Sequence, residues 1–463
     1  MLKRSNSFRA WIGRALVVVM LAAPVTACDF VSPTTSDPNA VPEAQLSQLF
    51  TTAQLAAWFI TETSLSRFGS MWVEQMAGTD RQFVTVGQYI IGEESGDEVW
   101  FTLYTGGGLV DIRQAQAQAE ARGDNVTLGI LQIHEAYLVG TAASAYGAIP
   151  YSEAVDPEVE TPSLDSQTAV YAAVQALLDT AIGNLQAGGN PTIPEARDMV
   201  FQMDTGAWIA VARTLKARYF LHTRDYASAG AQAAMGIMDP ANSWLAFHTS
   251  SSTEDNSWFE FMQDRSGYIS AGSFLVNLLQ DANDPRLLFY YEPQNGQVTG
   301  SNKENPEPAS GLSLIGFGAP DFDFPIVTSW ENAFIRAEIA IRNNNAGAAQ
   351  GFVDDALEDQ EAFWASVTGQ IAVDIPDAVI NDLADVMLEK YKSMFLSIEA
   401  WNDYKRTCEP GFDNVFQGRQ PVARLPYPGA ERQTNPNIPP LAQQPEFNEV
   451  DAANLPCPAN DFR

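Results

Sequence analysis

Apolar residues recur every three or four positions in several long segments of the chain. This spacing limits the fold more than any other feature of the sequence. One such stripe consists of Val170, Val174, Leu177, Leu178, Ile182 and Leu185. An α-helix turns once in about 3.6 residues, so these side chains lie on one face of a helix. Similar stripes run through residues 128–142, 208–219 and 380–401, the last being the longest. The chain is therefore expected to consist mainly of amphipathic helices.

The helices are expected to pair. A second helix follows the one that ends near residue 224, and its Ala-rich sequence, residues 225–235, suits close helix contact. This favours tetratricopeptide-like hairpins, although a strict repeat of about 34 residues is not visible. Strand signals are sparse, and residues 81–91 are the best short candidate. The predicted fold class is mainly α, with tetratricopeptide-like helical hairpins and few short strands.

Three segments interrupt the helical pattern. Residues 241–291 hold ten aromatic residues, and residues 292–320 hold five Gly and four Pro, which predicts a loop. Residues 409–463 contain ten Pro, so they cannot be helical throughout and are expected to wrap over the helical body. We therefore expect one domain from residue 43 to 463. Its parts are a helical repeat part (43–240), an aromatic and loop-rich part (241–325), a second helical part (326–408) and a Pro-rich wrap (409–463).

The N-terminus has the features of an export signal. A basic segment precedes the apolar run Ala15–Ala23, which is too short to span a bilayer. The sequence Val25-Thr26-Ala27-Cys28 then resembles a bacterial lipobox. We expect residues 1–27 to be a lipoprotein signal peptide, Cys28 to be lipidated and residues 28–42 to be a tether. The alternative is an ordinary secretory signal with a chance cysteine.

The other two cysteines form an even pair. Cys408 and Cys457 remain once Cys28 is assigned to the anchor. In an exported protein this favours a disulfide, with two unpaired thiols as the alternative.

The charge excludes one class of partner and leaves catalysis open. A net charge of −31 argues against nucleic acid, because a phosphate backbone requires a basic surface. Among 57 acidic residues some pair always suits a glycosidase, so Glu93-Glu94, Asp321/Asp323 and Asp354-Asp355 are weak candidates. The three histidines, His134, His222 and His248, stand apart, and no Gly-x-Ser-x-Gly or His-Glu-x-x-His motif occurs. No catalytic residue, cofactor or metal site is predicted, although the acidic composition is compatible with a structural calcium ion.

Aromatic residues beside planar polar groups are candidates for sugar binding. The apolar face of a sugar ring stacks on Trp or Tyr, and its hydroxyl groups pair with Asp, Gln or Arg. Two sets meet this description, and for each single aromatic residue core packing is the more common role. The first set is Trp72 with Glu74, Gln75 and Arg81, near which Trp100 and Tyr104 are expected; the second is Trp258 with Asp264, Arg265 and Tyr268.

Five segments, in order along the chain, resemble conserved stretches of the SusD/RagB family of outer-membrane nutrient-binding lipoproteins. They are Asp37-Pro38-Asn39; residues 146–154 (YGAIPYSEA); residues 325–340, with Glu331 and Glu338; residues 401–406 (WNDYKR); and residues 424–428 (RLPYP), followed by Glu431 and residues 435–437. One departure is Ala145-Tyr146, where the family usually has an acidic residue before the Gly. The motifs also have structural interpretations, in which Arg406 and Arg424 pair with carboxylates to hold the wrap.

The resemblance implies both a fold and a function. It implies helical hairpins that support a loop-rich ligand face, and a SusC-like TonB-dependent outer-membrane barrel as partner. The expected protein is not an enzyme but a lipid-anchored protein on the outer membrane of a Gram-negative bacterium. It would bind oligosaccharide or peptide nutrients and deliver them to the barrel. The alternatives are a secreted all-helical glycoside hydrolase and a helical-repeat scaffold that binds only proteins.

Overall fold

The computed structural model describes residues 44–459. The chain divides into two units, Met1–Ala44 and Gln45–Arg463, and the helices and strands given below all belong to the second. The predicted signal peptide, Cys28, the tether and the Asp37-Pro38-Asn39 motif lie outside the described residues. Within residues 44–459, none of the helices has the length and apolar character needed to cross a bilayer.

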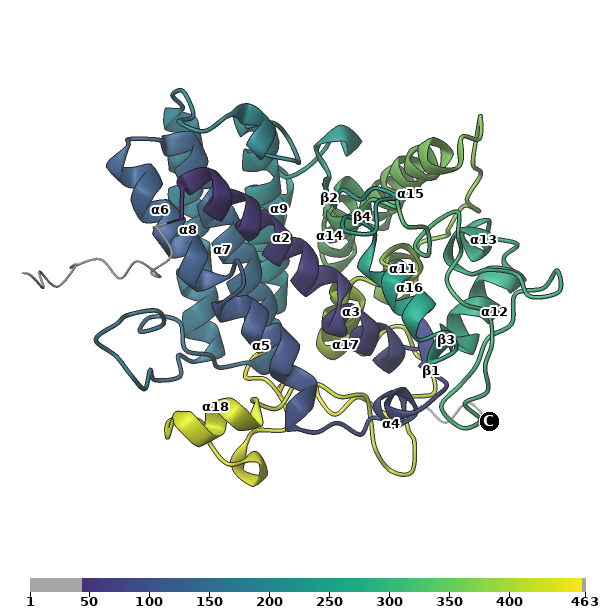
Figure 1. Cartoon of the computed structure of the whole chain (residues 1–463). Coiled ribbons are helices and arrows are strands. Elements are labelled where there is room, and N and C mark those ends of the chain that lie inside the picture. The colour runs from purple at the N-terminus through teal and green to yellow at the C-terminus, as the bar shows by residue number, and fades with distance from the viewer. Residues whose placement is uncertain (1–43, 460–463) are drawn as a thin grey trace, which may run out of the picture. The chain divides into compact units, whose positions relative to one another are not determined.

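The mainly helical fold predicted from the sequence is confirmed (Figure 1). The α-helices are α2 (Leu46–Glu62), α3 (Ser64–Trp72), α4 (Gln82–Gly87), α5 (Asp97–Tyr104), α6 (Leu109–Ala121), α7 (Asn125–Tyr146), α8 (Gln167–Ala187), α9 (Thr205–His222), α10 (Tyr226–Ala233), α11 (Ser257–Asp264), α12 (Ser273–Asp281), α13 (Arg286–Tyr290), α14 (Ser329–Arg342), α15 (Ala346–Thr368), α16 (Leu383–Ser393), α17 (Ile398–Thr407) and α18 (Gly429–Thr434). Short 3₁₀ turns are η2 (Glu93–Gly96), η3 (Glu195–Arg197), η4 (Pro240–Asn242) and η5 (Leu441–Gln443). The strands are β1 (Met76–Gly78), β2 (Trp244–Ala246), β3 (Ile269–Ala271) and β4 (Phe324–Val327).

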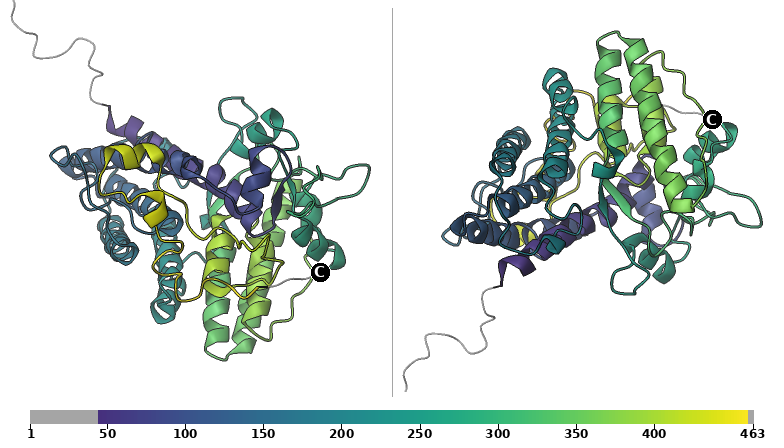
Figure 2. Two further views of the ribbon diagram at one scale, coloured as in Figure 1. Left: turned by 90° about the horizontal axis from the view of Figure 1, so that it is seen from below. Right: turned by 90° about the horizontal axis from the view of Figure 1, so that it is seen from above.

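Consecutive helices pack as hairpins. The closely packed pairs include α6 with α7, α7 with α8, α9 with α10 and α14 with α15. Figure 2 shows α14 and α15 side by side, with the C-terminal segment crossing the helices in the view from below. Side-chain caps begin many of these helices: Asp124 accepts from the backbone N–H of Thr127 at 3.0 Å at the start of α7. Gly147 caps the C-terminal end of α7, and its φ of 76° suits a residue without a Cβ.

The strands form two small antiparallel pairs, β1 with β3 and β2 with β4. Met76, Ala77 and Gly78 face Ala271, Ser270 and Ile269. Each pair therefore joins segments that are far apart in the sequence.

The strand expected at residues 81–91 is wrong, because this segment contains helix α4. Phe83 and Val86 are three residues apart and both are buried, which is helical spacing. The predicted stripe at residues 380–401 is likewise divided between α16 and α17, because the chain turns at Leu396, whose φ is 60°.

The core contains many of the aromatic side chains and two of the histidines. His134 is fully buried against Trp208 and Trp244, and burial lowers its pKa to about 4. It is therefore neutral at pH 7 and has a packing role. His222 is also buried and contacts Glu399 at 2.8 Å.

Candidate functional site

The pairing of β1 with β3 places Arg81 beside Tyr268. The backbone N–H of Thr79 donates to the carbonyl oxygen of Tyr268 at 2.8 Å, just beyond the end of β1. The Cζ atom of Arg81 then lies 5.5 Å from the centroid of the Tyr268 ring, which is cation–π geometry. Two predicted ligand-binding residues, one from each aromatic set, therefore lie together.

Arg81 holds an unusual backbone conformation. Its φ is 48°, in the left-handed region that a residue with a Cβ adopts at a cost of about 1–3 kcal/mol. The turn is tight here, since a Cβ on Gly78 would lie 1.8 Å from the carbonyl oxygen of Phe83. The fold therefore uses strain to place the Arg81 side chain, which is exposed to solvent.

Two further arginines lie near the ring of Phe261, which belongs to the same aromatic cluster. The Cζ atoms of Arg67 on α3 and Arg265 at the end of α11 lie 4.6 and 6.0 Å from the centroid of the Phe261 ring. Phe83 packs between, with its ring centroid 5.3 Å from that of Phe261 and 6.2 Å from that of Tyr268. We call this cluster the arginine–aromatic face. Arg67, Phe68, Arg81, Arg265 and Tyr268 reach its surface, and the rings of Phe83 and Phe261 are buried directly beneath them.

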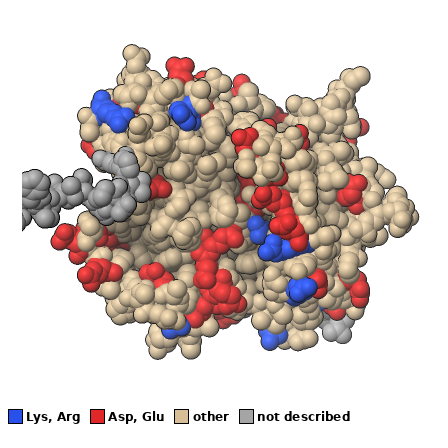
Figure 3. Space-filling model, in the orientation of Figure 1, with Lys and Arg blue, Asp and Glu red and all other residues tan. Residues whose placement is uncertain are grey.

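The face is positively charged in an acidic protein. Within residues 44–459, no carboxylate lies within 4.0 Å of the guanidinium of Arg67 or Arg265, and Arg81 has only the exposed Asp80 at 3.7 Å. Burial lowers the pKa of Arg67, and the nearby charge of Arg265 lowers it further against the opposing effect of Glu98. Figure 3 shows the surface in the orientation of Figure 1, on which basic side chains are few and acidic ones many. The face therefore offers hydrogen-bond donors that protein carboxylates have not already taken.

These groups suit a polyhydroxylated ligand. A guanidinium presents several N–H donors in one plane, which matches neighbouring hydroxyl oxygens. The half-buried rings of Phe68 and Tyr268 supply apolar surface beside them. A neutral sugar needs this combination of planar donors and flat apolar surface.

Trp72 and Trp258 do not contribute to this surface, which corrects their predicted role as ligand platforms. Both side chains have 0% exposure. The indole N–H of Trp72 donates to the carbonyl oxygen of Val86 at 3.1 Å, and that of Trp258 donates to the hydroxyl of Ser66 at 3.0 Å. They form the floor under the face, because a large apolar ring releases more free energy when it is buried in the core.

Trp100 and Tyr104 belong to a different aromatic cluster. Their ring partners include Tyr146 and Tyr427, and the hydroxyl of Tyr104 donates to the carbonyl oxygen of Pro150 at 2.7 Å. Trp100 is 7% exposed and Tyr104 is half-buried. These two residues help to hold the C-terminal segment against α5 and α7 and do not join the arginine–aromatic face.

Sequence reasoning missed Arg67, Phe68, Phe83 and Phe261. Arg67 is the one basic residue in the largely apolar segment 53–73, and this isolated charge could have identified it as a candidate from the sequence. The position of Phe83 and Phe261 against each other depends on the β1–β3 pairing, which no local pattern indicates.

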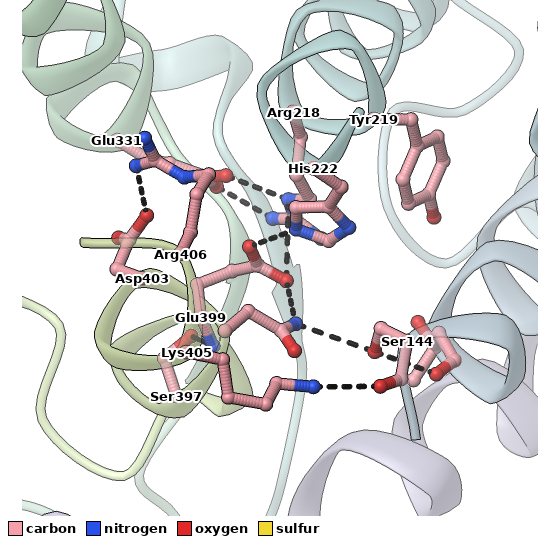
Figure 4. Close-up of polar contacts among 12 residues, drawn as sticks. Ser144, Arg218, Tyr219, His222, Glu331, Ser397, Glu399, Asp403, Lys405 and Arg406 are labelled. Atoms are coloured by element: carbon pink, nitrogen blue, oxygen red, sulfur yellow. Dashed lines mark hydrogen bonds and ion pairs between the residues drawn. The ribbon is translucent and has the colours of Figure 1, made fainter. Parts of the chain in front are cut away.

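A buried polar network fixes α17 under the C-terminal wrap (Figure 4). Arg218 donates to Glu331 at 2.6 Å through Nε, and Arg406 pairs with Glu338 and Asp403, each at 2.6 Å. Lys405 donates to the carbonyl oxygen of Ser144 at 2.7 Å.

This network sets the charge of its carboxylates. Although burial alone would raise the pKa of Glu338, the guanidinium groups of Arg406 and Arg342 lower it to about 2. The predicted pairing of Arg406 with a carboxylate is therefore confirmed. The same prediction for Arg424 is wrong, because no carboxylate of residues 44–459 lies within 4.0 Å of its guanidinium group.

A disulfide joins Cys408 to Cys457, with 5.5 Å between their Cα atoms. It connects the end of α17 to the last part of the described chain. The wrap is thus attached covalently at one end and by polar contacts along its length.

Two of the acidic residues considered as glycosidase candidates have partners within the protein. Glu93 pairs with Arg432 at 2.7 Å, and Asp323 accepts from the backbone N–H of His248 at 3.1 Å. No group of three or more His, Cys, Asp or Glu residues in the described part of the chain is placed to hold a metal ion.

Helical hairpins, two small strand pairs and a donor-rich face define the architecture of the described chain. Residues 38–428 match the model of the SusD-like family, which is described as starch-binding and associating with the outer membrane. The chain therefore belongs to the SusD-like family. A search of curated protein sequences gave no significant match.

Solved structures of SusD-like proteins share this fold. A SusD/RagB family protein from Bacteroides thetaiotaomicron is 20% identical, with a TM-score of 0.71 over 89% of this chain and 98% of that one. A chitin-binding SusD homolog from Flavobacterium johnsoniae is 18% identical, with a TM-score of 0.69 over 90% of this chain and 97% of that one. At this identity the likeness concerns the fold.

Proposed function

We propose that this protein is an outer-membrane lipoprotein that binds an oligosaccharide on the arginine–aromatic face and passes it to a SusC-like TonB-dependent barrel. The observation that carries the binding role is the group of three arginines without buried carboxylate partners, set around aromatic rings in a chain of net charge −31. Donors that the protein leaves unpaired are available to ligand hydroxyl groups.

The comparisons favour a glycan over a peptide as the ligand. The family description names starch, and the structural neighbour from Flavobacterium johnsoniae is described as chitin-binding. Both polymers consist of pyranose units, whose apolar faces suit ring stacking. A panel of starch and chitin oligosaccharides is therefore the first set of ligands to test.

Calorimetric titration of the chain from residue 29 tests the binding role. This chain lacks residues 1–28 and keeps the whole compact unit, which starts at Gln45. We expect at least one neutral oligosaccharide to bind, and Arg81→Ala to weaken that binding. The matched control is Arg122→Ala, since Arg122 is exposed at the end of α6 and lies outside the face. If no glycan binds and members of a peptide library do, the ligand class is peptide and not glycan.

Delivery and anchoring are tested in the cell that makes the protein. We expect the full chain to fractionate with the outer membrane, to lose that location in Cys28→Ser and to co-purify with a large barrel. The lipobox sequence and the family description support this arrangement. Recovery of the wild-type chain in the soluble periplasm without a barrel would contradict it.

We infer binding without turnover. The family is described by starch binding. Incubation with the bound glycan is expected to release no reducing ends. If reducing ends are released, and substitution of a single carboxylate residue abolishes this release, the alternative of a glycoside hydrolase is supported instead.

A further inference from the structure

A cavity of about 730 Å³ lies in the C-terminal wrap, and it shares no residue with the arginine–aromatic face. Its walls come from the segment after α4, from α17 and from three stretches of the wrap (415–426, 441–447 and 455–459). Cavities of roughly 300–1,000 Å³ hold small-molecule ligands in proteins. We call it the wrap cavity.

Arg424, in its wall, is a buried arginine without a carboxylate. It is 6% exposed, its Nη1 donates weakly to the side-chain oxygen of Gln444 at 3.3 Å, and its Cζ lies 4.4 Å from the centroid of the Tyr427 ring. Its Nη2 is buried and has no hydrogen-bond partner within residues 44–459. Burial lowers its pKa, although the nearby tyrosines oppose this shift.

The other buried arginines provide an internal comparison. Within residues 44–459 the arginines below the same exposure are Arg218, Arg286 and Arg406, and each of these contacts at least one carboxylate. A buried guanidinium without a counter-charge costs free energy that such pairs recover. Arg424 is therefore the exception among these four arginines, and it lines the wrap cavity without a carboxylate partner.

Tyr89 is a second exception in the same cavity wall. It is 6% exposed, and its hydroxyl has no hydrogen-bond partner in the described part of the chain. The other buried tyrosines there, Tyr137, Tyr146, Tyr171, Tyr219, Tyr290, Tyr291, Tyr391, Tyr404 and Tyr427, all have one. Buried polar groups in native proteins are normally satisfied, so two orphans in one cavity indicate a missing partner.

The charges of the wall define the chemistry of that partner. The charged lining residues are Arg419, Arg424 and Glu446, so the wall at Arg424 carries two positive charges and one negative charge. The carboxylates of Glu74, Glu304 and Asp413 lie near Tyr89, on the other side of the cavity wall. Gln420 and Gln444 add amide groups, and Phe447 adds an apolar surface. One anionic group with hydroxyl groups beside it fits this lining.

We propose that the wrap cavity binds a uronic acid unit, with the sugar carboxylate on Arg424 and its hydroxyl groups within reach of Tyr89 and Gln444. That the ligand carries an anionic group follows from the cavity alone. That this anion is the carboxylate of a sugar rests on the proposed function. The protein then has two sites, a neutral-sugar face and an acidic-sugar cavity, so a polymer with both kinds of unit is the ligand that engages both.

The test is calorimetric titration of the chain from residue 29 with an α-1,4-linked galacturonate trimer and with the neutral galactose trimer of the same linkage. We expect the acidic trimer to bind the wrap cavity and the neutral trimer not to bind there. Arg424→Gln is expected to weaken binding of the acidic trimer by roughly tenfold or more, because it removes a charge-assisted pair. Arg432→Gln is the matched control, since it removes one positive charge from a half-buried pair in the same segment that does not line the cavity.

A second variant keeps the proposal falsifiable if Arg424→Gln does not fold. Tyr89→Phe deletes only the unpaired hydroxyl, so it is expected to keep the melting temperature and to weaken binding of the acidic trimer a few-fold. Unchanged binding in both folded variants overturns the proposal. The proposal is also overturned if the acidic trimer binds only after residues 460–463 are removed. That result would mean that these four residues of the protein compete with the trimer for the cavity.

The same titrations separate the two sites. Arg81→Ala is expected to weaken starch or chitin oligosaccharide binding and to leave the acidic trimer unaffected. If the wild type binds no neutral oligosaccharide but binds the acidic trimer, the proposed function is contradicted and the wrap-cavity proposal stands. If it binds neutral oligosaccharides but not the acidic trimer, the wrap-cavity proposal is contradicted and the proposed function stands. Binding of a carboxylate-terminated peptide in place of the trimer would overturn the sugar assignment.

Discussion

The guanidinium of Arg81 lies over the ring of Tyr268, with 5.5 Å between its Cζ atom and the ring centroid. These residues lie beyond the same end of a strand pair, β1 with β3, which joins distant parts of the chain. The contact places a charged donor and a flat ring side by side at the surface, and the left-handed backbone of Arg81 keeps it there.

We predict that Arg81→Ala and Tyr268→Ala each weaken oligosaccharide binding by about 1 kcal/mol, or about fivefold, with little change in stability. Arg81→Lys is expected to recover only part of the loss, because an ammonium group lacks the planar set of donors. Calorimetric titration and a melting curve measure the two effects. Equal affinities for the wild type and both alanine variants would remove this surface from the ligand site.

We predict that Trp258→Ala acts on stability and not on ligand contact. The side chain is fully buried, and removal of a buried Trp costs about 3–5 kcal/mol. The folded fraction is expected to keep its ligand affinity. Denaturant unfolding measures the stability. A stable Trp258→Ala variant that had lost binding would instead restore the original prediction that Trp258 contacts the ligand.

We predict that Glu338→Gln makes the protein less stable at pH 7 and less sensitive to acid. The pKa of Glu338 is about 2 in the folded chain and near 4.5 when unfolded. The folded state therefore gains stability from this group above pH 4.5, and loses it as the pH falls from 4.5 towards 2. The difference corresponds to about 3 kcal/mol.

Unfolding curves at pH 7 and pH 3 measure this effect. The expected stability gap between wild type and Glu338→Gln narrows at the lower pH. The matched control is Glu93→Gln, whose partner Arg432 lies at the surface, so its removal is expected to have little effect. A gap that stayed constant with pH would mean that Glu338 is not ionised in the folded protein.

We predict that replacing both Cys408 and Cys457 with Ala lowers the free energy of unfolding by about 4 kcal/mol in the chain-entropy model. The bond closes a loop with a sequence separation of 49 residues, so its loss frees a long segment of the unfolded chain. Unfolding of the wild type with and without reductant, beside the double variant, measures the effect. A wild type that is insensitive to reductant and equal to the double variant would show that the bond contributes no stability.

Local patterns were sufficient for the helices and for the family. The stripe from Val170 to Leu185 lies in α8, and four of its residues beyond Val170 are buried, namely Val174, Leu178, Ile182 and Leu185. Helical spacing is a local property, so it is readable without tertiary structure. The order of the weak motifs identified the SusD-like family, which the match over residues 38–428 confirms.

The same reasoning failed where side chains must choose between core and surface. Trp72 and Trp258 stand in segments without periodicity, and they were therefore assigned to ligand binding. In the structure they form the floor of the face, whereas the smaller Tyr268 and the charged Arg81 reach the surface. Which ring is covered depends on the elements packed above it, and this information is not local.

The sequence by itself determined the helical class, the family and the cysteines available for a bond, because amphipathic spacing and motif order are written along the chain. Only the tertiary structure decided that Arg81 meets Tyr268. It also decided that Arg424 alone, among the four described arginines with an exposure of 6% or less, has no carboxylate partner. Both facts concern distances between residues that are remote in sequence. Such distances follow from the packing of whole elements, so the surfaces proposed to bind ligand become visible only in the folded molecule.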